Sequence, residues 1–164
     1  MSGVLAVVAA LALVSCAGAR VADGVFRSER GYRVSLPGPG WRVVEDSRAD
    51  LELRHADGAA GMLVNAACDP AMLRRSHEIL LRHLLLGVRD REVIEAGELP
   101  LNGRVAGHAL LEGRWRQDDE RMRIEAYVLK GRTCVYDLVY AAPPAVFGAR
   151  HEDFRRFVDS FTTE

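Results

Sequence analysis

The chemistry open to this chain depends first on its three cysteines. Cys16 follows an uncharged apolar run near the N-terminus, whereas Cys68 and Cys134 lie far apart in the body of the chain. A thiol behind an apolar leader can carry lipid, and two thiols brought together can form a disulfide. No two of the cysteines have the CxxC spacing that is typical of redox sites. Lipid attachment and disulfide formation are therefore the chemistries to weigh.

The segment Leu13-Val14-Ser15-Cys16 resembles the lipobox of bacterial lipoprotein signal peptides. The resemblance implies cleavage before Cys16 and diacylglycerol on its sulfur. Apart from this covalent lipid, we expect no cofactor. The apolar run over residues 4–14 fits a signal peptide and is too short for a bilayer core, which needs about 20 helical residues. A plain secreted protein and an uncleaved anchor are the alternatives. Met1-Ser2-Gly3 lacks the basic residue that is usual in a signal peptide, which a start codon placed too far downstream would explain.

The same resemblance implies a bacterial cell-envelope protein held on a membrane by its acyl chains. Ala17 follows the cysteine instead of Asp, which in enteric-type sorting favours the outer membrane, facing the periplasm. The net charge of −1 gives no electrostatic reason to expect nucleic acid as a partner. We predict a signal peptide over residues 1–15, a lipidated N-terminus and short tether over 16–25, and one globular domain over 26–164.

In an oxidising compartment, Cys68 and Cys134 are expected to form a disulfide. Cys68 ends a predicted strand just before a helix, and Cys134 lies near the start of the last long predicted strand. Two buried free thiols and a redox pair are the alternatives.

The other reactive side chains form no catalytic or metal-binding pattern. No zinc-type spacing joins the five histidines, which are His55, His77, His83, His108 and His151. We interpret each as a surface or half-buried side chain. The serines lack a nucleophile elbow, and Asp118-Asp119-Glu120 is more typical of a solvated hairpin tip than of a cation site. We expect no enzyme and assign no catalytic, metal-binding or ligand-binding residue.

The elements that position these residues follow an α+β order. Period-two alternation and turn residues predict strands over residues 32–36, 41–44, 51–54, 61–67, 92–99, 105–115, 121–129 and 133–141. On the strand over 121–129, Met122 and Ile124 belong to the predicted apolar face, and Arg123 and Glu125 to the polar face. The tryptophans and tyrosines at strand spacing could line a groove but are more typical of a core; they are Trp41, Trp115, Tyr127, Tyr136 and Tyr140.

Two helices are predicted between and after these strands. Asp69-Pro70 is a helix start, with Asp as N-cap and Pro at the first position, and this helix is expected to run to about residue 86. Phe154, Phe157 and Phe161 predict a closing amphipathic helix because they share one helical face.

A family resemblance rests on both ends of this pattern. The start, Gly31-Tyr32-Arg33-Val34-Ser35-Leu36-Pro37 followed by Gly40-Trp41, and the end, Phe154-Arg155-Arg156-Phe157-Val158-Asp159-Ser160-Phe161, are similar to PsbP-like domains. The resemblance implies an α+β, three-layer α/β/α sandwich with a mostly antiparallel, meandering sheet. Ran-binding Mog-type proteins also use this fold. The chain further resembles small bacterial envelope lipoproteins that keep the Cys68 and Cys134 segments.

Members of this superfamily mostly act as accessory or binding proteins. The resemblance therefore implies a non-catalytic lipoprotein that binds a protein partner or supports an envelope complex. The alternative is a carrier of a small apolar or lipid ligand, held between sheet and helices. A deep apolar cavity inside the sandwich would favour the carrier, whereas a filled core with an exposed apolar patch would favour a protein partner.

Overall fold

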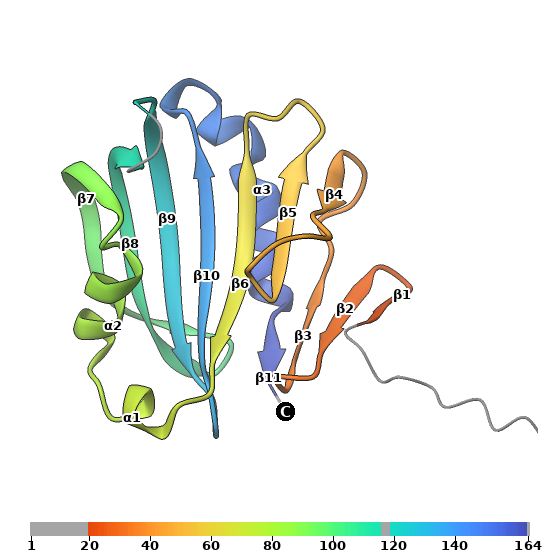
Figure 1. Cartoon of the computed structure of the whole chain (residues 1–164), viewed down its shortest axis with the longest axis vertical. Coiled ribbons are helices and arrows are strands. Elements are labelled where there is room, and N and C mark those ends of the chain that lie inside the picture. Colours follow the sequence, from red (N-terminus) through yellow and green to blue (C-terminus); the bar gives the residue numbers. More distant parts are fainter. Residues whose placement is uncertain (1–19, 116–118, 164) are drawn as a thin grey trace, which may run out of the picture.

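A seven-stranded sheet forms the centre of the computed structural model, which describes residues 20–115 and 119–163 (Figure 1). Across the sheet, the strands lie in the order β4 (Trp41–Val43), β5 (Leu51–His55), β6 (Gly61–Ala67), β10 (Val135–Ala142), β9 (Arg121–Lys130), β8 (Arg104–Trp115) and β7 (Val88–Leu101). All six neighbouring pairs are antiparallel. The strand β7 begins four residues earlier than the predicted strand over 92–99, and two register shifts interrupt its pairing with β8.

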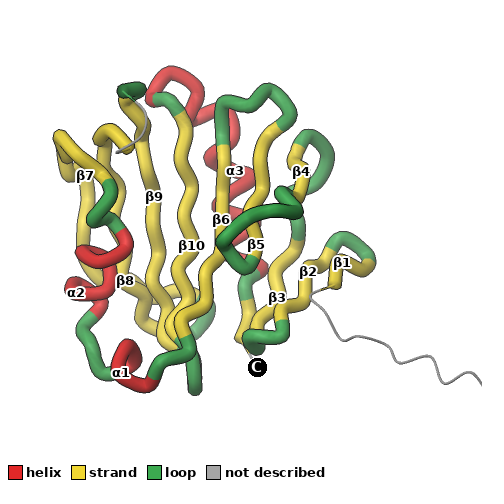
Figure 2. Tube along the Cα trace, in the orientation of Figure 1, coloured by secondary structure: helices red, strands yellow, loops and turns green. Residues whose placement is uncertain are grey.

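Helices lie on both faces of this sheet (Figures 1 and 2). The helix α3 (Pro144–Ser160) covers one face, while α1 (Pro70–Leu73) and α2 (His77–Leu84) lie on the other. Each side has its own apolar core, one beneath α3 and one beneath α2. Gly107 lets α2 approach β8 closely, since a Cβ atom there would lie 2.7 Å from the Cβ of His77. The predicted α+β, three-layer α/β/α sandwich with an antiparallel sheet is confirmed.

A second, four-stranded sheet extends the layer of α3. Its order is β1 (Arg20–Ala22), β2 (Val25–Ser28), β3 (Tyr32–Ser35) and β11 (Thr162–Thr163). A tether was expected over residues 16–25. Residues 20–25 instead form β1, a turn and the first residue of β2. The reason is a tight turn at Asp23-Gly24, where both residues have positive φ, 51° and 72°. Asp-Gly is a strong hairpin signal, and it joins β1 to β2.

The helix predicted from Pro70 to about residue 86 is wrong in one respect, because the structure divides it. Asp69 is the N-cap of α1, and its carboxylate accepts the Ala71 N–H at 2.8 Å, as expected. After Arg74, the chain leaves the helix, and Ser76 caps α2 by accepting the Ile79 N–H at 3.3 Å. A serine hydroxyl in this position satisfies an amide that would otherwise lack a partner, so it starts a new helix.

The disulfide joins Cys68 to Cys134, with their sulfur atoms 2.00 Å apart. Strand register brings the two cysteines together, because Val135 of β10 lies opposite Ala67 of β6 and the next residues on each side are the cysteines. The bond closes a loop with a sequence separation of 66 residues. In the chain-entropy account, a loop of this length stabilises the fold by about 4 kcal/mol.

The apolar stripe of α3 attaches the helix to the sheet. Phe154 and Phe157 are fully buried, and Phe161, one residue beyond the helix end, is 1% exposed. Phe154 packs against Tyr140 of β10 with the ring centroids 5.3 Å apart. Phe161 stacks on Tyr32 of β3 at 5.2 Å, so the stripe joins both sheets into one core.

We expect Phe157→Ala to lower the free energy of unfolding by about 3–5 kcal/mol, because it removes a fully buried aromatic ring and leaves a cavity. Urea denaturation followed by circular dichroism measures the change. Val146→Ala on the same helix, at a side chain that is 37% exposed, is the control and should change stability by less than about 1 kcal/mol. Equal losses in the two variants would contradict the packing described here.

Candidate binding site

The sheet face opposite α3 is covered only in part. In Figure 1, α1 and α2 lie over the lower part of this face and its β7 side, while no helix lies over the upper parts of β6, β9 and β10. A groove of about 580 Å³ lies on the uncovered part. Its floor is apolar because alternate residues of three neighbouring strands point to this face: Leu63, Met122, Val139 and Ala141.

Trp115, at the end of β8, lines the groove with its indole 39% exposed. A Cβ atom at Gly87 would lie 3.9 Å from this ring, so the indole extends over the loop that follows α2. The other aromatic residues considered from the sequence lie outside the groove. Tyr136 and Tyr140 belong to the core beneath α3, and the indole of Trp41 donates to Asp153 at 3.0 Å.

Charged side chains border the apolar floor. Glu52 of β5 accepts the Ser47 hydroxyl at 2.6 Å and the Arg54 Nε at 2.9 Å. Both hydrogen bonds hold the pKa of Glu52 below its ordinary value despite its partial burial, and the bond from Ser47 has the larger effect. Glu120 is exposed where the groove meets the start of β9. Arg54 is the basic residue among the groove-lining residues, so the border has two acidic residues and one basic residue.

Asp137 of β10 continues the groove floor toward α1. It points to the same sheet face as Val139, two residues away, and lies opposite Asn65 of β6. Two strand residues span about 7 Å, so its carboxylate lies one row beyond the groove floor. No hydrogen bond or ion pair reaches this carboxylate from residues 20–115 or 119–163. Burial therefore raises its pKa to about 7.

A second polar cluster lies beneath α3. Glu125 of β9 is 5% exposed, and its carboxylate accepts three hydrogen bonds. The donors are His108 Nε2 at 3.0 Å, Tyr127 Oη at 2.8 Å and His151 Nε2 at 2.5 Å. His108 comes from β8 and His151 from α3, so one carboxylate ties the helix to two strands. Burial alone would raise the pKa of Glu125, but these three donors outweigh it and hold the pKa below the ordinary value of 4.5.

This cluster corrects two sequence expectations. Glu125 was assigned to the polar face of its strand, yet α3 covers that face from Glu125 onward. Tyr127 and Leu129 point to the same face of β9 as Glu125. Their apolar character is the signal in the sequence that this face is buried. His108 was interpreted as a surface or half-buried side chain, yet it is 5% exposed.

The remaining predicted site residues lie apart from one another. His55 pairs with Asp57 at 2.8 Å, His77 pairs with Glu98 at 2.6 Å, and His83 is exposed. Asp119 and Glu120 are exposed beside the start of β9, and Asp118 lies outside the described residues. Cys16, with the rest of the predicted signal peptide and lipidated end, also lies outside them.

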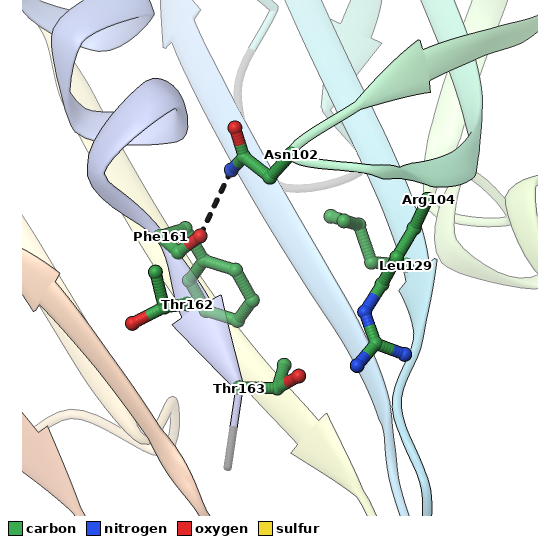
Figure 3. A pocket seen from close by; sticks show the side chains of 6 residues that line it. All are labelled: Asn102, Arg104, Leu129, Phe161, Thr162 and Thr163. Atoms are coloured by element: carbon green, nitrogen blue, oxygen red, sulfur yellow. Dashed lines mark hydrogen bonds between the residues drawn. The ribbon is translucent and has the colours of Figure 1, made fainter.

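A smaller hollow of about 180 Å³ lies at the other end of the sheet, between the β7–β8 turn and β11 (Figure 3). Asn102 and Arg104 line one side of it, and Thr162 and Thr163 the other. The Asn102 amide donates to the Val158 and Phe161 carbonyls at 3.0 and 2.8 Å. These bonds satisfy carbonyls at the end of α3, so we assign this hollow a structural role.

The described residues show neither a metal-binding cluster nor a membrane-spanning helix. Within residues 20–115 and 119–163, no group of three or more His, Cys, Asp or Glu side chains is arranged to hold a metal ion. Over the same ranges, no helix has both the length and the apolar character needed to cross a membrane.

The antiparallel sheet between α3 and the α1–α2 layer is the fold of PsbP-like and Mog1-like proteins. The structure is similar to PsbP (CyanoP) of the cyanobacterium Synechocystis sp. PCC 6803, with a TM-score of 0.62 and 17% identity over 93% of this chain and 99% of that chain. It is also similar to the Ran-binding protein Mog1p of Saccharomyces cerevisiae, with a TM-score of 0.56 and 12% identity over 81% of this chain and 90% of that one.

A third similar structure is LpqN of Mycobacterium tuberculosis, which is involved in cell envelope biogenesis. Its TM-score is 0.55, at 16% identity over 82% of this chain and 86% of that chain. No protein-family model matches the sequence, and no curated protein sequence matches it. At these identities, the likenesses show the fold, and the predicted PsbP-like or Mog-type sandwich is confirmed at that level.

We expect His108→Ala to destabilise the protein by about 1–3 kcal/mol, because it removes a buried donor from the Glu125 carboxylate. His83→Ala, at an exposed side chain of α2, is the control and should change stability by less than about 0.5 kcal/mol. Chemical denaturation at pH 7 compares the two variants. If both had the same small effect, the bond from His108 to Glu125 would not contribute to stability.

We expect Asp137→Asn to change how stability depends on pH. The pKa of Asp137 is about 7 when folded and 3.8 ordinarily, so the folded state binds an extra proton between these values. Stability of the wild type should therefore fall as pH rises from about 4 through 7, by at most about 4 kcal/mol. The variant should lack this loss and be more stable at pH 8. Denaturation at pH 5 and 8 tests this, with Asp159→Asn, at an exposed aspartate, as control; parallel profiles would contradict it.

Proposed function

We propose that this protein is a membrane-anchored envelope lipoprotein that acts as a non-catalytic accessory or binding protein of an envelope complex. The observation that carries the proposal is the contrast between a filled interior and an open groove on one face. Central core side chains such as Leu138, Phe154 and Phe157 are fully buried. Apolar side chains form the floor of the groove, with the exposed Trp115 at its side. Exposed apolar surface bordered by polar residues is typical of protein interaction sites.

The similar structures support a binding role at the level of fold. Mog1p binds Ran, and LpqN is involved in cell envelope biogenesis. The proposal gives this chain an envelope location through its own sequence, because Leu13-Val14-Ser15-Cys16 resembles a lipobox. The proposed lipid on Cys16 holds the protein at the outer membrane, facing the periplasm. The disulfide fits an oxidising compartment of this kind.

A carrier of a small apolar or lipid ligand is the second candidate. The observation that favours it is the groove volume of about 580 Å³, which falls within the range of about 300–1,000 Å³ for small-ligand sites. Native mass spectrometry of protein released from its membranes separates the two candidates. A stoichiometric lipid in addition to any on Cys16 would support the carrier, whereas a bound polypeptide would support the accessory role.

The anchor gives the first test. Mass spectrometry of the mature N-terminus should find diacylglycerol on Cys16, and Cys16→Ala should leave the precursor unprocessed. Cys68→Ala is the matched control, because it removes a different thiol and should leave processing intact. A soluble product that begins at another residue would refute the lipoprotein assignment.

The partner gives the second test. Crosslinking of the tagged protein in its own membranes, followed by pull-down, should recover an envelope protein. Recovery should depend on the groove, so Trp115→Ala should reduce it, while Val146→Ala on α3 should not. Equal recovery by both variants would place the interaction elsewhere on the molecule.

A further inference from the structure

We propose that the open sheet face binds a segment of a protein partner that carries apolar side chains and one basic side chain, and that the basic side chain pairs with Asp137. This inference rests on the proposed function and specifies its partner. It joins two features described above, the apolar groove and the unpaired carboxylate at its end. No intramolecular role of the described residues accounts for that carboxylate.

The register of the sheet makes these two features one surface. Leu63 of β6 lies opposite Val139 of β10, and both line the groove. The next row on the same face holds Asn65 opposite Asp137. A segment lying along β10 would therefore contact the apolar floor and, about 7 Å further, the aspartate. Asn65 adds an amide beside the carboxylate, so this row is polar while its neighbour is apolar.

The charged residues of this surface indicate which kind of partner it binds. A buried carboxylate without a partner destabilises the fold, and a Lys or Arg side chain brought to it would remove that cost. Two acidic residues, Glu52 and Glu120, and one basic residue, Arg54, border the same groove, so its border is acidic on balance. An acidic partner or a carboxylate-bearing ligand would be repelled here. A lipid tail would fill the floor but leave Asp137 unpaired, so the surface favours a basic polypeptide.

The carboxylate is accessible to such a partner. Asp137 is half-buried, so part of the residue is exposed to solvent. By contrast, Glu125 has three donors and lies beneath α3. Asp137 is therefore a half-buried acid that is open to an external cation.

Photocrosslinking identifies the occupant. Trp115 is replaced by p-benzoylphenylalanine in the full-length protein in its own cells, and the crosslinked segment is sequenced by mass spectrometry. Val146 on α3 is replaced in the same way as the control, because it is 37% exposed on the opposite layer. We expect the Trp115 position alone to capture a polypeptide segment that combines apolar residues with Lys or Arg.

The captured segment is then synthesised as a peptide, together with a version in which its basic residue is changed to Gln. Binding to the purified protein and to Asp137→Asn completes a double-mutant cycle. We expect either change alone, Asp137→Asn in the protein or the basic residue to Gln in the peptide, to weaken binding at least tenfold. When one change is already present, the other should weaken binding by less than a further threefold. The Asn variant is not expected to unfold, because it removes an uncompensated buried acid.

The outcomes separate this inference from the proposed function. A captured segment without a basic residue, or independent effects in the cycle, would overturn the pairing with Asp137 and leave the accessory role standing. Capture of lipid alone at Trp115 would overturn the inference in favour of the carrier. Absence of any partner from both crosslinking sites and from the pull-down would overturn the proposed function itself.

Discussion

The packing of α3 against the central strands is the interaction on which the rest of the structure depends. Its phenylalanines fill the space between the seven-stranded sheet and the smaller sheet, so that the helix and both sheets share one core. The Glu125 cluster adds a polar contact within that apolar interface, with donors from β8, β9 and α3. A buried carboxylate is tolerable only when its hydrogen-bonding capacity is met, and here the helix itself supplies one of the donors.

The two faces of the sheet are covered to different extents, and this difference produces the candidate site. The 17 residues of α3 extend along one face, whereas α2 has eight residues and α1 four. The apolar residues of β6, β9 and β10 continue past the end of this shorter cover. The groove is therefore the remainder of a core-forming surface, and Asp137 interrupts it at a point where a sheet covered on both faces would carry another aliphatic residue.

Local patterns in the sequence were sufficient for most of the fold. Alternation in residues 121–129, the Asp69-Pro70 helix start and the phenylalanine stripe each correspond to an observed element. The hairpin at Asp23-Gly24 and the helix break at Ser76 also have local signals, a turn dipeptide and an N-cap serine. No local pattern is sufficient to predict the groove or the Glu125 cluster. Both depend on which part of each sheet face is covered by a helix that is distant in the sequence. His151 and Glu125 are 26 residues apart and meet only when α3 packs. The lipid on Cys16 stays a prediction.

The Cys68–Cys134 bond has a topological consequence. It closes the chain from the end of β6 to the start of β10 into a covalent ring that contains α1, α2 and three strands of the central sheet. A protease that cuts once anywhere within this ring opens it without releasing a fragment. The two products would stay joined through sulfur and through the sheet, and would separate only after both reduction and denaturation. A single cleavage between β8 and β9 would therefore leave the rest of the molecule joined.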